Sequence, residues 1–463
     1  MKMRTEQKTA VKNSIGRLVF VALSVLLQVI WICVQAMKLN RYSTWISVAT
    51  SVLTLVVVIL LYGRRTNAAF KMPWIILILA FPVLGLGMYL LFGRKEATQL
   101  VRERFERIDQ SLDGLLIQDK AVRIKLQQTD RMAANEAAYI WNYAKYPIYQ
   151  NTDVVFYKEA SEGIEAQKQA LNQAKHFIFM EYHAIEDKQS FGELKEILAR
   201  KAKEGVEVRL FYDDIGSIGF INTDFIQRME AEGIQCRVFN RLMPVLNVFM
   251  NNRDHRKITV IDGKIGFTGG YNLADEYFNI THPYGYWKDT GVRLEGDAVR
   301  SLTVMFLEMW NAIKGTDTDY TPYFLQDGAQ PHEAGLAGSV GVTQSDANIA
   351  ADSASGFVQP YADSPLDGEP VGENVYMGVV KAASEYVYFT TPYLIISDEM
   401  SRELCLAAKR GVDVRIVTPG IPDKKLVYRV TRSYYAQLAS AGVRIFEYTP
   451  GFLPAKQCVS DDV

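Results

Sequence analysis

The chain has 463 residues, of which 49% are hydrophobic and 22% charged, and its formal net charge is −1. This length is enough for two ordinary domains. The near-zero charge excludes a molecule that is basic over its whole surface, so an anionic substrate would need a local site. The four cysteines lie far apart without CxxC or metal-type spacing, which argues against a disulfide framework.

Three uncharged apolar runs, residues 18–37, 43–62 and 72–92, dominate the N-terminus. Each reaches the roughly 20 residues that a helix needs to cross a bilayer. The first run is too long for a typical cleaved signal and lacks a small-x-small cleavage site. We therefore expect residues 1–93 to be a multi-pass anchor in the cell membrane. Pro82 and Gly85 predict a kinked or partly re-entrant third helix, and basic residues on both flanks leave the sidedness open.

Beyond the anchor, a pattern of alternating strands and helices occurs twice. The first copy contains HFIFMEY and LKEILARKAKEGVEVRLF, and the second contains YVYFT and SRELCLAAKRGVDVRIV in the same layout. Two copies of one α/β unit indicate duplication rather than a solenoid. We expect an α/β fold with a first lobe at residues 94–310, a second at 355–463, and a Gly- and Ser-containing linker at 311–354 between them.

One motif in the first copy carries candidate chemistry. In DHRKITVIDGKIGFTGGYNLADEY, three residues fit the spacing His-x-Lys-x4-Asp, namely His255, Lys257 and Asp262. His255 and Lys257 are two apart on a predicted strand and so project from the same face. Gly270 would let the backbone approach a ligand closely, and Asn272 follows as a possible polar contact.

These residue types fit phosphodiester exchange. A neutral imidazole can attack phosphorus and form a covalent intermediate, while an ammonium beside it offsets the charge that builds on the phosphate oxygens. A carboxylate can fix the tautomer of the imidazole. The scheme needs neither a metal ion nor a cofactor.

The motif resembles the signature of the phospholipase D superfamily. The flanking stretches EYHAIED, KEGVEVRLFYDDIGS, WKDTGVRLEGDAV and TTPYLI are similar to those of bacterial cardiolipin synthases. The resemblance implies a duplicated phospholipase D-like fold in which both motifs meet at one active site. One histidine would be the nucleophile and the other the acid and base. Two phosphatidylglycerol molecules would be joined with release of glycerol, and the partners would be membrane lipids.

The second motif departs from this pattern. In GFLPAKQCVSDDV, Lys456 and Asp461 stand at the right spacing, but Pro454 occupies the histidine position. Proline cannot carry a proton, so we expect a rate loss of at least about 10²-fold. The sequence stops two residues after Asp461, which predicts a second copy that is incomplete, with fewer strands and low stability. The alternatives are a phospholipid hydrolase and an inactive membrane protein fragment. A nuclease should be more basic and would need no anchor.

Other polar residues allow two interpretations each. Glu181 ends a buried strand, where an unpaired acid is costly, so it either binds substrate or forms a structural ion pair. His183, just beyond that strand, would line the pocket or pack. Asp213 and Asp214 follow the next strand at an end where α/β proteins place their sites, although helix capping explains them equally well.

Overall fold

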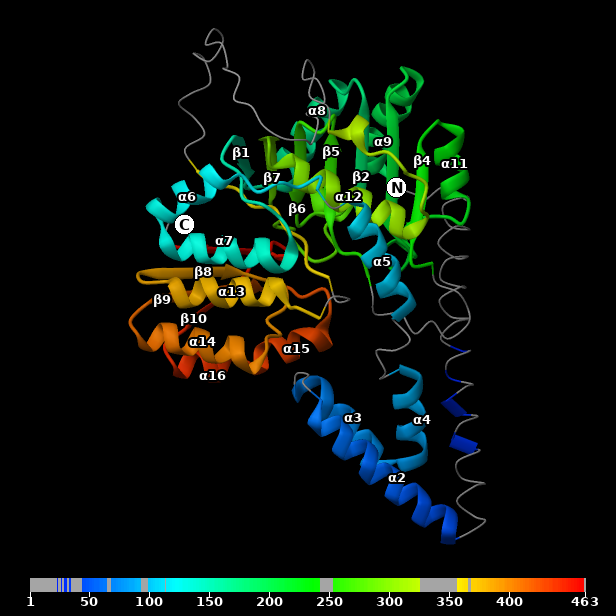
Figure 1. The fold of residues 1–463 in the computed structure, drawn as a ribbon, viewed down its shortest axis with the longest axis vertical. Helices are drawn as coiled ribbons and strands as arrows, with labels where there is room; N and C mark the ends of the chain where they lie inside the picture. Colours follow the sequence, from blue (N-terminus) through cyan, green and yellow to red (C-terminus); the bar gives the residue numbers. More distant parts are fainter. Residues whose placement is uncertain are drawn as a thin grey trace, which may run out of the picture. The chain divides into compact units, whose positions relative to one another are not determined.

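The computed structural model describes residues 44–64, 68–92, 99–112, 114–241, 253–324, 356–364 and 368–461, with isolated positions between 23 and 34. The chain forms two compact units (Figure 1). One comprises Met1–Arg104 with Asn240–Arg253, and the other Phe105–Phe239 with Asp254–Val463. Most of the first apolar run lies outside the described residues.

The helices α2 (Thr44–Gly63), α3 (Ala68–Ala80) and α4 (Pro82–Phe92) belong to the first unit. The third apolar run is therefore two helices rather than one, since α3 ends just before Pro82. Gly85 permits α4 to fold back on α3, because a Cβ there would lie 2.6 Å from the Leu77 carbonyl oxygen. Among the described positions, no helix has both the length and the apolar character needed to cross a bilayer, so the predicted spans are not confirmed.

The second unit begins with a seven-stranded sheet in the order β1-β7-β6-β5-β2-β3-β4. The strands are β1 (Thr152–Tyr157), β2 (Phe177–Tyr182), β3 (Glu207–Asp213), β4 (Gln235–Phe239), β5 (Lys257–Ile261), β6 (Ile265–Gly269) and β7 (Gly291–Gly296). β2, β3 and β4 run parallel, whereas β5 is antiparallel to β2. The start of β5 therefore lies beside the end of β2.

Helices cover both faces of this first-lobe sheet. Successive β2 residues point to opposite sides, so Ile178 and Met180 join the core with α8 (Ala160–Asn172), α9 (Gln189–Lys203) and α11 (Phe225–Ala231). Phe177 and Phe179 pack on α12 (Val299–Ile313). The remaining helices of this part of the chain are short or peripheral: α5 (Gln99–Leu112), α6 (Lys120–Thr129), α7 (Arg131–Ala144), α10 (Asp214–Ser217), η2 (Asp275–Phe278) and η3 (Thr321–Tyr323).

The second lobe repeats the central part of the first. Its sheet has the order β10-β9-β8-β11, formed by β8 (Tyr386–Thr390), β9 (Asp413–Pro419), β10 (Arg444–Tyr448) and β11 (Gln457–Ser460). This order matches β4-β3-β2-β5, with the same parallel and antiparallel pairs. The helices are α13 (Val371–Ala382), α14 (Asp398–Lys409), α15 (Lys425–Ser433) and α16 (Tyr435–Ser440). The predicted duplicated α/β fold is confirmed.

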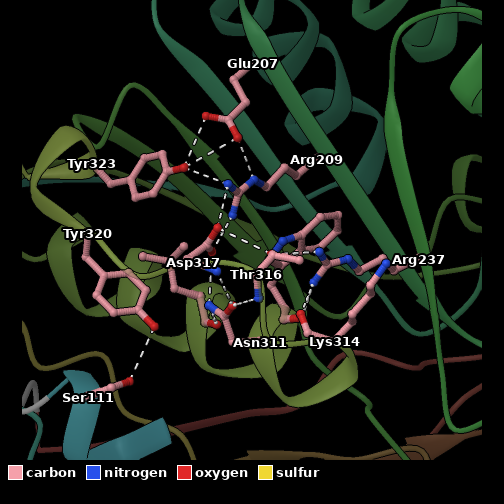
Figure 2. Close-up of polar contacts among 12 residues, drawn as sticks. Ser111, Glu207, Arg209, Arg237, Asn311, Lys314, Thr316, Asp317, Tyr320 and Tyr323 are labelled. Carbon is pink, nitrogen blue, oxygen red and sulfur yellow. Dashed lines mark hydrogen bonds and ion pairs between the residues drawn. The ribbon is translucent and has the colours of Figure 1, made fainter.

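A buried arginine ties the segment after α12 to the first sheet at the end opposite Asp213 (Figure 2). Arg209 donates to both carboxylate oxygens of Asp317, at 2.7 and 3.0 Å, and to the Tyr323 hydroxyl at 2.6 Å. It also pairs with Glu207, the first residue of β3, at 2.7 Å. Charge-assisted bonds of this kind are stronger than neutral ones, so the network holds this segment in place.

The two lobes also contact each other directly. Helices α7 and α13 pack side by side (Figure 1), and the Tyr139 hydroxyl donates to Glu369 at 2.6 Å. At a second contact, Gly285 and Gly451 form an antiparallel bridge. There the Lys288 N–H donates to the Phe452 carbonyl at 3.0 Å. We call this second contact, formed by residues 285–288 and 451–452, the seam. On the second-lobe side it lies just before Pro454.

Candidate active site

His255 lies just before β5 and therefore beside the end of β2. Its side chain is exposed, and the Lys257 ammonium donates to its carbonyl oxygen at 2.7 Å and lies 3.2 Å from its Nδ1. The ring of His183 lies beside that of His255, with centroids 4.6 Å apart. His183 is itself oriented by a 2.7 Å hydrogen bond from its Nδ1 to the Asp254 carbonyl. The pair of imidazoles marks the centre of the site.

The surroundings keep His255 neutral. Protein surrounds part of the exposed ring and reduces its contact with water, and the nearby cations Lys257, Lys456 and Lys424 add positive charge, so the pKa of His255 falls to about 2. Burial and the charge of Lys456 lower the pKa of Lys257 to about 7. A free imidazole with ammonium groups close by is the arrangement that nucleophilic attack on a phosphate anion requires.

The second lobe contributes its own motif to this site. The Lys456 ammonium donates to the Pro454 carbonyl at 3.1 Å, as Lys257 does to that of His255. Pro454 therefore occupies the position in the second lobe that His255 occupies in the first. At the seam, Gln457 donates to the Thr290 hydroxyl at 2.7 Å. The lysines of the two copies therefore lie close enough for the charge of Lys456 to act on Lys257.

Asp289, which the motifs did not predict, lies close enough to both motif lysines for their charges to act on it. Its side chain is fully buried, and its Oδ2 has no hydrogen-bond partner among the described residues. Burial raises the pKa of Asp289 to about 7, although the Thr290 N–H and the charges of Lys456 and Lys257 oppose the rise. The residue stands in WKDTGVRLEG, 34 positions after His255, so only the fold brings it to the site.

Asp262 and Asp461 are placed away from the imidazole. Asp262 follows β5 at the end opposite His255, and its carboxylate accepts three backbone hydrogen bonds of 2.8–2.9 Å from Lys175, His176 and Phe177. Asp461 does the same after β11, accepting from the backbone of residues 384–386. Both have positive φ, 53° and 46°. In the structure these aspartates join two strands rather than orient a histidine.

The residues predicted to bind substrate have other partners. Glu181 is fully buried on the α12 face of β2 and pairs with Arg256 at 2.7 Å, which selects the ion-pair interpretation. Burial, the largest influence, raises the pKa of Glu181, and the Arg256 charge opposes it. A Cβ at Gly270 would lie 2.0 Å from Asp289 Oδ1, so this glycine makes room for Asp289. The backbone at Gly270 thus approaches a side chain of the protein, whereas the sequence predicted a close approach to a ligand.

Asn272 and Asp213 are occupied as well. The Asn272 amide donates to the Tyr277 hydroxyl at 2.7 Å and its oxygen accepts from the Ala184 N–H at 3.1 Å. The Asp213 Oδ1 caps α10 by accepting from the N–H groups of residues 215 and 216. Its Oδ2 accepts from the Asp254 N–H at 3.2 Å, which braces the segment that presents His255.

The protein has two lobes of one α/β fold, and they bring the lysines of a repeated motif close to a neutral histidine, His255. This arrangement is that of a phospholipase D-like protein. The family model described as "Cardiolipin synthase, PLD-like domain" matches residues 168–310 and 376–463. A second, described as "Phospholipase_D-nuclease N-terminal", matches residues 50–94.

The chain is also similar to individual proteins. An uncharacterized protein of Streptococcus mutans is 39% identical over 88% of this chain and 83% of its own. A cardiolipin synthase of Halalkalibacterium halodurans is 32% identical over 90% of this chain and 80% of its own. A crystal structure of phosphatidylserine synthase from Haemophilus influenzae covers 71% of this chain and 81% of its own, with 12% identity and a TM-score of 0.47. The chain belongs to the cardiolipin synthase family of phospholipase D-like proteins.

Proposed function

We propose that this protein is a phosphatidyltransferase that joins two phosphatidylglycerol molecules into cardiolipin and releases glycerol. The observation that carries the proposal is the exposed, neutral His255 with ammonium groups of both lobes around it. Phosphatidylglycerol is an anionic phosphodiester, and such a group needs both a nucleophile for phosphorus and cations for its oxygens.

In the first step, a ring nitrogen of His255 attacks phosphorus, and the bond between phosphorus and the glycerol oxygen breaks. The departing oxygen takes up a proton and leaves as glycerol. In the second step, a glycerol hydroxyl of another phosphatidylglycerol gives up its proton and attacks the phosphorus. The bond to His255 then breaks and the imidazole is free again. Lys257 and Lys456 offset the charge that develops on the phosphorus oxygens in both steps.

A second candidate function is a slow enzyme of the same family. It would form the covalent phosphatidyl–His255 intermediate, called the adduct below, but would transfer it to the acceptor slowly. Pro454 favours it, because it stands where the second lobe would otherwise offer an imidazole at the position equivalent to His255. Without that imidazole, the departing glycerol would take its proton from water or from another group of the site. We expect an adduct on His255 in either case, so the two candidates differ in turnover.

We further propose that the first unit holds the protein at the cell membrane. Leu55, Ile59 and Leu60 on α2 are 59–64% exposed, and an apolar surface of this kind is favourable in contact with lipid. Sedimentation of the protein with membranes after a high-salt and carbonate wash would support this. Recovery in the supernatant would contradict it.

The direct test of the reaction uses membranes that contain the full chain and radiolabelled phosphatidylglycerol. We expect cardiolipin and glycerol from the natural protein, and a loss of at least about 10²-fold in His255→Ala. His282→Ala is the matched control, because His282 is exposed and belongs to neither motif. Cardiolipin formation that survives His255→Ala would overturn the proposal, and phosphatidic acid as product would identify a hydrolase instead.

A further inference from the structure

Helix α15 begins next to the candidate active site. Lys424, the residue before its first turn, donates to the Tyr393 hydroxyl at 2.9 Å and pairs with Asp423 at 3.3 Å. On the inner side of the helix, Thr431 is buried and its hydroxyl accepts from the Leu394 N–H at 3.1 Å. These contacts fix which side of α15 faces outward.

Two apolar side chains are exposed on the outward side of α15. Leu426 is 75% exposed and Val430, one turn later, is 42% exposed. Ile421, which precedes the helix, is 40% exposed and lies against the first lobe, since a Cβ at Gly285 would be 3.1 Å from its Cδ1. Tyr286, the next residue of that lobe, is also exposed. Exposed apolar side chains therefore lie on α15, just before it, and across the seam on the first lobe.

Basic residues flank this apolar surface. Lys425 and Arg429 are exposed, one helical turn apart, beside Leu426 and Val430, and α15 contains no acidic residue. The neighbouring helix α14 differs, because it carries three acidic residues against two basic ones. The surface of Ile421, Lys425, Leu426, Arg429 and Val430, which we call the α15 face, thus joins exposed aliphatic side chains to positive charge.

We propose that the α15 face docks on an anionic lipid bilayer and presents its headgroups to the site beside it. Helices that lie in a membrane interface combine an exposed apolar stripe with flanking Lys and Arg. Their cations are attracted by anionic lipids. Nucleic acid would match the cations but gain nothing from the exposed Leu426. The choice of lipid chemistry rests on the proposed function, whose substrate is itself an anionic lipid.

Hydrogen exchange of the full chain in lipid nanodiscs tests this without requiring turnover. We compare nanodiscs of phosphatidylcholine alone with nanodiscs that also contain phosphatidylglycerol. Backbone amides of α15 should exchange several-fold more slowly in the anionic nanodiscs, and high salt should reverse the effect. The first unit experiences both kinds of nanodisc, so the comparison isolates the contribution of anionic headgroups.

A matched pair of triple variants identifies the residues. Lys425→Gln, Leu426→Ser and Arg429→Gln together should weaken docking by about thirtyfold or more, since each basic residue contributes roughly fivefold at an anionic surface. Arg402→Gln, Leu406→Ser and Lys409→Gln make the same changes at exposed positions of α14 and should leave the protection of α15 intact.

Three outcomes would overturn the proposal. They are equal exchange of α15 in both nanodiscs, protection of α15 by added nucleic acid in place of lipid, and an equal loss from the α14 variant. Docking without any cardiolipin formation would instead count against the proposed reaction alone. The two failures are therefore distinguishable.

Discussion

At the scale of single residues, the site depends on how charge is distributed around His255. The sequence singled out His255, Lys257 and Lys456, because the spacing His-x-Lys puts both groups of the first copy on one face, and the second copy keeps the lysine with Pro454 at the histidine position. It could not predict Asp289, which reaches the first motif only through the fold of the first lobe, or Lys424, which comes from the second lobe and reaches His255 only when the lobes pack. A buried carboxylate such as Asp289 has no local sequence signal that separates it from an ordinary loop residue.

Removing the neighbouring ammonium should make His255 easier to protonate. Burial and the charges of Lys257, Lys456 and Lys424 lower its pKa to about 2, so Lys257→Met should move that pKa up toward the ordinary value of about 6.5. Diethyl pyrocarbonate modifies neutral imidazoles, and its reaction with His255 can be followed against pH by peptide mass spectrometry. In the natural protein reactivity should persist well below pH 6, whereas in Lys257→Met it should decline at higher pH.

Lys264→Met is the matched control for this titration. Lys264 is exposed in the turn after β5, at the end of that strand opposite His255. An unchanged profile in Lys257→Met, or an equal change in Lys264→Met, would show that the ammonium does not set the protonation of His255.

Restoring an imidazole in the second lobe should raise turnover. General acid–base assistance is commonly worth about 10²–10⁴ in rate, and Pro454 stands at the position equivalent to His255. We therefore expect Pro454→His to increase cardiolipin formation by on the order of 10²-fold, measured with radiolabelled phosphatidylglycerol. Pro454→Ala removes the proline ring without supplying a proton carrier. A gain of similar size in Pro454→Ala would contradict the explanation.

At the scale of secondary-structure elements, the two lobes share the same order of strands, and they also share the turn with a positive-φ aspartate that follows β5 in one lobe and β11 in the other. The order of strands and helices could be predicted from sequence, because each copy shows the same succession of apolar strand, amphipathic helix and glycine. The role of the motif aspartate could not, since spacing along a strand does not reveal which end faces the substrate. Asp262 and Asp461 each accept backbone hydrogen bonds that hold β2 and β8 to their neighbours.

Substitution of Asp262 should therefore lower the stability of the fold more than the rate of adduct formation on His255. Asp262→Ala leaves three N–H groups without their acceptor, at a cost of about 1–3 kcal/mol, and places alanine at a positive φ that it disfavours. Asp262→Asn keeps one oxygen acceptor and tolerates that backbone, so it should be milder. Thermal unfolding measures both. A large loss of adduct at His255 in folded Asp262→Asn would restore the catalytic role that the sequence suggested.

At the scale of the whole second unit, the site exists because two lobes meet. The first lobe supplies His255, Lys257 and Asp289, whereas the second supplies Lys456 and Lys424. Their meeting depends on the seam, where backbone pairs with backbone and leaves no room for a side chain. A Cβ on Gly451 would lie 2.1 Å from the Tyr286 carbonyl oxygen. No local sequence pattern predicts this contact between the lobes.

Gly451→Ala should loosen the seam and weaken the site together. Overpacking of this kind costs typically about 1–3 kcal/mol, and the displaced second lobe would carry Lys456 away from His255. We expect faster proteolysis between the lobes and a higher pKa of His255, followed by diethyl pyrocarbonate as above. Gly192→Ala, in α9 with no atom within 4 Å of the added Cβ, is the control. Native resistance to protease in Gly451→Ala would contradict the packing argument.

Covalent trapping tests the central claim most directly. The full chain would be mixed with phosphatidylglycerol in membranes, quenched at alkaline pH to preserve a phosphorus–nitrogen bond, digested, and examined by mass spectrometry. We predict a phosphatidyl adduct on the peptide that contains His255, and its disappearance in His255→Ala. An adduct on another side chain, or lipid products formed with His255 unmodified throughout, would contradict the account.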